Sequence, residues 1–99
     1  MKSLAAILPG VLRELKLADA AAGWRAVSEW PSISGERIAR RTRATAFRDG
    51  VLTIEVEGSA WMHELGFLER DLVQRVNQHL GANIVRELRF MRSRGGIPQ

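Results

Sequence analysis

The 99-residue chain has the length of one domain, and its 45% hydrophobic and 26% charged residues are ordinary for a globular protein. It lacks cysteine, which excludes a disulfide framework and a thiolate metal site. Its apolar runs are too short for a membrane span, and the first apolar patch is too short for a signal peptide. The simplest expected location is the cytoplasm.

The net charge of +4 is a weak signal, but the charge is unevenly distributed along the chain. Residues 37–48 hold five arginines and no acid, and residues 86–94 hold four arginines and one acid. The rest of the chain is acidic on balance. Segregated positive charge of this kind is the usual electrostatic footprint of a polyanion site.

The first third of the chain predicts two helices. One covers residues 11–16, and the other begins after Asp19, a good N-cap, and continues to Trp30 with apolar residues at helical spacing. Pro31 is expected to end the second helix and to open a loop. Residues 36–40 are then expected to form one further helical turn.

A β-hairpin is predicted next, with strands over residues 41–48 and 51–57. Asp49-Gly50 between them is the strongest short hairpin signal. Apolar and polar residues alternate in the second strand, so one face of the hairpin should be buried and the other wet. A two-residue turn would pair Phe47 with Leu52, Thr45 with Ile54, and Arg43 with Val56.

A long helix is expected from Ser59, as its N-cap, to Gly81. On a helical wheel, Trp61 shares one narrow core-facing stripe with later apolar residues, so its ring is expected in the core. Residues 84–92 predict a last strand. The stripe comprises Trp61, Leu65, Leu68, Leu72 and Val76, and the inward residues of the strand are Leu88 and Phe90.

These elements predict an α+β fold in the order α-α-β-β-α-β, with helices packed on one face of a three-stranded sheet. Residues 1–92 would form the single domain, and residues 93–99 a short flexible tail.

No catalytic or metal-binding pattern is present. The two histidines, His63 and His79, lie 16 residues apart on one predicted helix, about 24 Å along its axis, so they cannot share a metal or a proton. His79 falls on the apolar stripe near the helix C-terminus, which favours a structural role. Ser59 lacks the nucleophile-elbow pattern, and Glu55 and Glu57 are expected to be solvated. The sequence therefore predicts neither an enzyme nor a cofactor.

The arginine runs are the stronger candidate for a functional site. They fall on the entry to the first strand and on the last strand of one expected sheet, which favours contact with nucleic acid over a merely solvated face. Because most aromatic residues are assigned to the core, binding should depend on phosphates and carry little sequence information. The candidate residues are Arg37, Arg40, Arg41, Arg43, Arg86, Arg89, Arg92 and Arg94.

Phe67 is a second candidate, because on the same wheel it falls far from the core stripe and among polar residues. Either the N-terminal helix covers it, or it is an exposed anchor for a partner protein. The residues grouped with it are His63, Arg70 and Gln74.

An ordered set of short motifs over residues 10–92 resembles the DciA family of bacterial replicative-helicase operators. The matching residues are Trp30-x-x-Ile33-x-Gly35-x-x-Ile38-Ala39-x-Arg41-Thr42, then Phe47-Arg48-Asp49-Gly50-Val51-Leu52-Thr53-Ile54-Glu55-Val56, then Ser59-Ala60-Trp61, Glu64-Leu65-x-Phe67-Leu68, Leu72, Asn77, Leu80-Gly81 and Val85-x-x-Leu88-Arg89-Phe90.

The resemblance implies a KH-like fold of the bacterial type, binding to single- or double-stranded DNA, and an interaction with the replicative DNA helicase that helps to place it on DNA. It implies no catalysis, cofactor, membrane or small-molecule substrate, and a nucleoid-associated place in the cytoplasm.

Two features of the chain depart from what the resemblance implies. The strand-to-helix turn reads Gly58-Ser59-Ala60-Trp61 rather than the GxxG of a KH clamp, and the chain ends at residues 95–99 without the long basic tail of many relatives. The helicase contact is therefore expected on the folded domain. The alternatives are a KH-like RNA- or ribosome-associated factor, a protein-interaction adaptor that does not bind nucleic acid and, more remotely, a small hydrolase.

Overall fold

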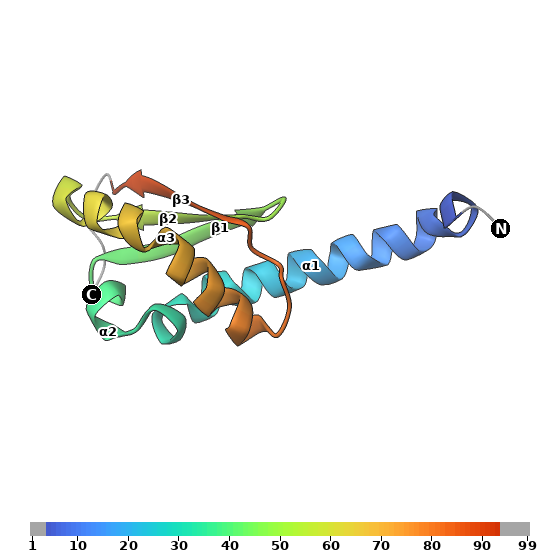
Figure 1. The fold of residues 1–99 in the computed structure, drawn as a ribbon, viewed down its shortest axis with the longest axis horizontal. Helices are drawn as coiled ribbons and strands as arrows, with labels where there is room; N and C mark the ends of the chain where they lie inside the picture. The colour runs from blue at the N-terminus through green and yellow to red at the C-terminus, as the bar shows by residue number, and fades with distance from the viewer. Residues whose placement is uncertain (1–3, 94–99) are drawn as a thin grey trace.

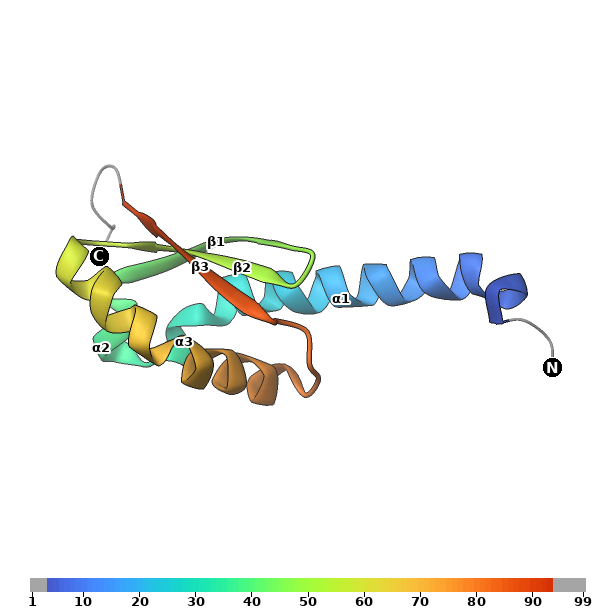
Figure 2. The ribbon, with the colours of Figure 1, turned by 45° about the horizontal axis from the view of Figure 1, so that its top comes forward.

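The structure is a computed structural model that describes residues 4–93, and it confirms the predicted α+β class and element order (Figure 1). Three helices lie on one side of a three-stranded sheet, as Figure 2 also shows. None of the helices in the described part of the chain has the length and hydropathy needed to cross a membrane. The elements are α1 (Leu4–Ser34), α2 (Glu36–Ala39), β1 (Thr42–Arg48), β2 (Val51–Val56), α3 (Ser59–Leu80) and β3 (Glu87–Arg92).

Helix α1 is one continuous helix of 31 residues, so the predicted break before Asp19 and the predicted end at Pro31 are both wrong. Pro31 lies in the last turns of α1 and has no N–H to donate to the carbonyl of Val27, yet the helix continues to Ser34. Its carbonyl still accepts a hydrogen bond from the N–H of Gly35 at 3.1 Å. The helix ends at Gly35 instead, whose φ of 90° disfavours residues with a side chain. The N-terminal half of α1 extends beyond the sheet (Figure 1).

The sheet has the order β1-β2-β3, with β1 antiparallel and β3 parallel to β2. The predicted Asp-Gly turn is confirmed, because Asp49 and Gly50 have φ values of 50° and 81°. The amide of Arg86 donates to the carbonyl of Gly50 at 2.9 Å, which joins the start of β3 to the hairpin turn.

A β-bulge at Thr45 changes the register of the hairpin. Phe47 faces Leu52 as predicted, but beyond the bulge Ala44 faces Ile54 and Arg43 faces Glu55, so the other two predicted pairs are wrong. The predicted register would have directed Arg43 into the core, and burying its guanidinium would be costly. The bulge places Ala44 in the core instead and leaves Arg43 exposed.

The core lies between the sheet and helices α1 and α3. Its largest fully buried side chains include Trp30 of α1, Leu52 and Ile54 of β2, and Leu65 of α3. The Trp30 indole donates to Thr42 Oγ1 at 2.8 Å, and that hydroxyl donates to the carbonyl of Ile38 at 2.7 Å. This buried chain of hydrogen bonds joins α1, β1 and α2, and so fixes the position of α2.

Helix α3 ends at Gly81 as predicted, with a left-handed φ of 78°, but its N-cap is Gly58 rather than Ser59. Strand β3 begins at Glu87, later than predicted. The reason is Asn77, whose side chain bonds the backbone of Ile84 and Val85 and holds that segment outside the sheet.

Candidate nucleic-acid and partner sites

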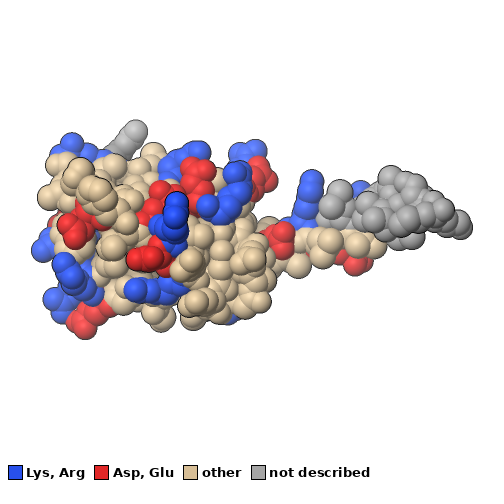
Figure 3. Space-filling view, viewed as in Figure 1, with Lys and Arg blue, Asp and Glu red and all other residues tan. Residues whose placement is uncertain are grey.

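The structure divides the predicted arginines into two groups, because β1 and β3 are the opposite edges of the sheet. Strand β2 and the residue after it place acids between them: Arg43 pairs with Glu55 at 3.0 Å, and Arg41 pairs with Glu57 at 2.9 Å. On the face drawn in Figure 3, basic and acidic side chains are interleaved. The charge is therefore less segregated in space than along the chain.

The first group lies where α2 meets the N-terminus of α3. The guanidinium carbon of Arg37 lies 5.5 Å from the centroid of the Trp61 ring, a cation–π contact, and Arg40 forms an ion pair with Glu36. Together with Arg41, these side chains line a shallow hollow. Trp61, predicted in the core, packs against the core but is only partly buried.

The start of α3 adds to the positive potential of this hollow. Gly58 provides no side-chain cap, and the first turn of α3 contains no acidic residue. The unpaired N–H groups and the helix dipole therefore act in the same direction as the arginines.

The second group lies along β3 and directly before it. Arg86 donates to the carbonyl oxygen of Asp49 through Nε at 3.2 Å and Nη2 at 3.0 Å, and so holds the hairpin turn. Arg89 and Arg92 are exposed, and within residues 4–93 neither forms an ion pair. The eighth predicted residue, Arg94, lies outside the described residues.

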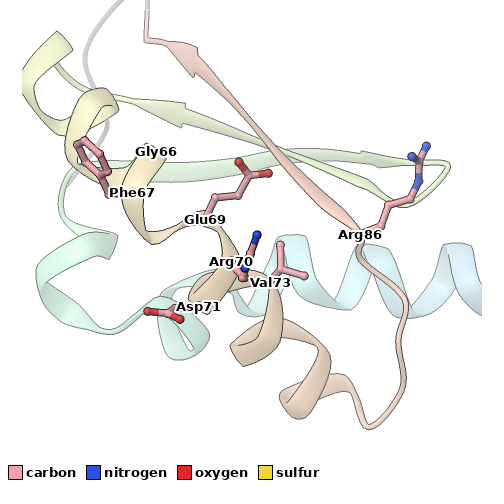
Figure 4. Close-up of a pocket in the computed structure, with 7 residues that line it drawn as sticks. All are labelled: Gly66, Phe67, Glu69, Arg70, Asp71, Val73 and Arg86. Carbon is pink, nitrogen blue, oxygen red and sulfur yellow. The ribbon is translucent and has the colours of Figure 1, made fainter.

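Phe67 is exposed over 77% of its surface, so α1 does not cover it. The ring of His63 meets it edge-on, with centroids 5.0 Å apart. Phe67 and Arg70 line a groove that α3 forms with the start of β3 (Figure 4). Gln74 lies farther along α3 and lines a separate hollow. The structure thus brings together three of the four predicted partner residues.

His79 joins α3 to α1 through Glu29, with 2.6 Å between Nε2 and Oε1. Hydrogen bonds from His79 and then from Arg25 lower the pKa of the Glu29 carboxyl. Among the described residues, no three histidine or acidic side chains gather so as to hold a metal ion. The role of His79 in this structure is to join two helices.

Sequence reasoning missed two features of these sites. Glu55 and Glu57 are partners of arginines rather than merely solvated, and the Trp61 ring is part of the arginine hollow. The position of Trp61 in the first turn of a helix was the available signal, because the first turn of a helix lies at the margin of a core.

A family model described as "Dna[CI] antecedent, DciA" matches residues 3–90, nearly the whole chain. The chain belongs to the DciA family. Its relatives include a UPF0232 protein of Corynebacterium glutamicum, 35% identical over 72 residues, which are 73% of this chain and 40% of the relative. A UPF0232 protein of Mycobacterium tuberculosis is 32% identical over 64 residues, which are 65% of this chain and 34% of the relative. This DciA-family chain thus spans two fifths or less of the length of these relatives.

Proposed function

We propose that this chain is a nucleic-acid-binding accessory protein of DNA replication that helps to place the replicative DNA helicase on DNA. Membership of the DciA family supports a role beside the helicase. The observation that carries the nucleic-acid part is the arginine hollow, which Arg37, Arg40, Arg41 and Trp61 line together with Glu36 near the N-terminus of α3.

The arginine hollow suits a phosphate backbone better than a particular base. Its donors are guanidinium groups and helix N–H groups, which contact phosphate oxygens without reading sequence. One side of the Trp61 ring is already covered by Arg37 and another packs on the core, so little of the ring is left for stacking. Arg89 and Arg92 at the other edge of the sheet are a second, separate place for phosphates.

The test is a titration of single-stranded DNA, duplex DNA and RNA at two salt concentrations. Binding through four to six phosphates should give a slope of roughly −3 to −5 in log K against log salt, with little dependence on sequence. An affinity independent of salt would contradict a phosphate-based site. Clear preference for RNA would favour the RNA- or ribosome-associated alternative, since phosphate contacts alone do not separate the two.

The proposed helicase contact is the exposed ring of Phe67, with His63 against it and Arg70 one turn away. An exposed aromatic residue ringed by polar ones is typical of an interaction hot spot, and truncation would cost about 2–4 kcal/mol of binding. Because Phe67 and the arginine hollow lie on different faces of α3, one domain could hold both ligands.

Titration of the host's own replicative helicase with wild type and Phe67→Ala tests this contact. Leu17→Ala is the matched control, since Leu17 is a similarly exposed apolar residue (65%) on α1. We expect a loss of 30-fold or more for Phe67→Ala and no change for the control. No helicase binding by wild type would refute the placement role, whereas binding that survives Phe67→Ala would move the contact elsewhere.

A protein adaptor that does not bind nucleic acid is the second candidate. The pairing of Arg41 and Arg43 with glutamates favours it, because those charges are partly neutralised within the fold. Helicase binding without binding to any of the three nucleic acids would establish the adaptor in place of the first proposal.

A further inference from the structure

The outer side of β3 is an open sheet edge, because within the described residues β3 pairs only with β2. The amide of Glu87 donates to the carbonyl of Gly50 in the hairpin turn at 3.3 Å, and the amide of Ser93 donates to the carbonyl of Val56 in β2 at 2.9 Å. Since backbone groups alternate along a strand, those of Leu88, Phe90 and Arg92 point away from β2.

Only the first of these outward amides has a partner in the described part of the chain. The N–H of Leu88 donates to Glu69 Oε2 of α3 at 3.1 Å. No hydrogen bond of this kind reaches the outward N–H and C=O groups of Phe90 and Arg92. Such a row of unpaired backbone groups is a template for pairing with another extended chain.

A groove lies beside this edge. Glu69 and Val73 of α3 line it on the β3 side together with Arg86, whereas Figure 4 shows Phe67 on the far side of α3. A peptide that paired with β3 would have side chains alternately above and below the sheet, and those on the α3 side would lie beside Val73.

The charges around the edge favour an acidic peptide. Within the described residues, Arg89 and Arg92 on β3 have no carboxylate partner, so the positive charge lies on the strand itself; the groove is balanced, because Glu69 and Asp71 line it with Arg70 and Arg86. A polyanion such as nucleic acid would also be attracted, but it offers no backbone amides to the carbonyls of Phe90 and Arg92 and no aliphatic side chains to Val73. A protein segment matches all three features of the edge.

We propose that an extended, acidic segment of a partner protein adds to the sheet as a fourth strand along the outer side of β3, with one of its side chains beside Val73 of α3. The inference rests on the proposed partner contact on α3, and it specifies the chemistry and the backbone conformation of what binds there.

Amide hydrogen exchange in the presence of the replicative helicase tests the proposal. Exchange of the Phe90 and Arg92 amides should slow by tenfold or more on binding, because they gain hydrogen-bond partners. The amides of Arg89 and Met91 face β2 and are the internal reference, expected to change little. If the helicase binds while the Phe90 and Arg92 amides keep their free rates, strand addition is overturned and the proposed function stands.

A pair of variants at Arg92 separates the contribution of the outward backbone N–H from that of the guanidinium charge. Both Arg92→Ala and Arg92→Pro remove the guanidinium, but only proline also removes the outward N–H, while the ladder to β2 is kept. We expect Arg92→Pro to bind about five- to tenfold more weakly than Arg92→Ala, with unchanged thermal unfolding. Equal affinity of the two variants would overturn the proposal. If Arg92→Pro does not fold, the exchange measurement on wild type remains the test.

If the helicase does not bind, a synthetic peptide tests strand addition to β3 without it. The probe is a heptapeptide of alternating valine and glutamate, compared with the same peptide N-methylated at alternate amides. Slowed exchange of the Phe90 and Arg92 amides with the first peptide only would support strand addition while the proposed function fails. No effect of either peptide, or protection by a short oligonucleotide instead, would overturn it.

Discussion

Replacing Trp61 by alanine should destabilise the domain by about 2–3 kcal/mol. Truncation of a fully buried tryptophan costs about 3–5 kcal/mol, but the Trp61 ring is only partly buried, so about half of that value applies. Loss of the cation–π contact with Arg37 adds about 0.5–1 kcal/mol. For a domain of this size, the melting temperature should fall by about 10–20 °C.

Thermal and urea unfolding followed by circular dichroism measure this effect, and a nucleic-acid titration at a temperature where the variant is folded accompanies them. Trp24→Ala is the control, because Trp24 is 51% exposed on α1 and its loss should change stability by no more than about 0.5 kcal/mol. Nucleic-acid affinity of Trp61→Ala should fall only a few-fold, through the lost support for Arg37.

The opposite combination of stability and affinity would show that the Trp61 ring has a binding role instead of a packing role. If Trp61→Ala melts like wild type but loses nucleic-acid binding by more than tenfold, the ring stacks on a base rather than packing on the core. Stacking of that kind contributes about 1–3 kcal/mol per base, so the two cases are well separated.

Two further predictions concern the packing and the charge of α1 and α3. Gly23→Ala should be strongly destabilising, because a Cβ there would lie 2.0 Å from Cδ2 of Phe47, whereas Gly66→Ala meets nothing within 4 Å and should gain up to about 1 kcal/mol of helix stability. Urea unfolding of both variants checks this, and equal stabilities would contradict it. The hydrogen bond from His79 lowers the pKa of Glu29 below its ordinary value of 4.5, so its stabilising contribution is complete above that value and is lost as the pH falls through the lower folded pKa. Glu29→Gln should therefore weaken the acid dependence of unfolding, and an unchanged dependence would show that the pair does not stabilise the fold.

The parts of the fold that follow local chemistry could be predicted from the sequence. The Asp49-Gly50 turn and the end of α3 at Gly81 both need positive φ, and the residues that supply it are visible in the sequence. The core stripe of α3 was also predictable, because Leu65, Leu72 and Val76 are buried as their spacing indicates.

The parts that depend on tertiary context could not be predicted in the same way. The bulge at Thr45 is set by the cost of burying Arg43, which becomes apparent only when the sheet face is known. The prediction at Pro31 failed because helical bonding continues past it to Gly35. The charge pattern along the chain does not show that β2, with Glu55, separates the two arginine runs.

A matched pair of double variants tests whether phosphates bind at the arginine hollow. The first double variant, Arg37→Gln with Arg40→Gln, removes two charges from the arginine hollow. The control, Arg13→Gln with Lys16→Gln, removes two charges from the N-terminal half of α1. Arg41 is left in place because its loss would leave the partly buried Glu57 unpaired, whereas Glu36, the partner of Arg40, is exposed.

The decisive measurement is the affinity for single-stranded DNA of both double variants and wild type across a series of salt concentrations. We expect the hollow variant to bind at least tenfold more weakly, about equally for all sequences, with a salt slope that is shallower by about 1–2. The α1 variant should stay within about twofold of wild type. Equal losses in the two variants, or full affinity in the hollow variant, would contradict the assignment of nucleic-acid binding to this site.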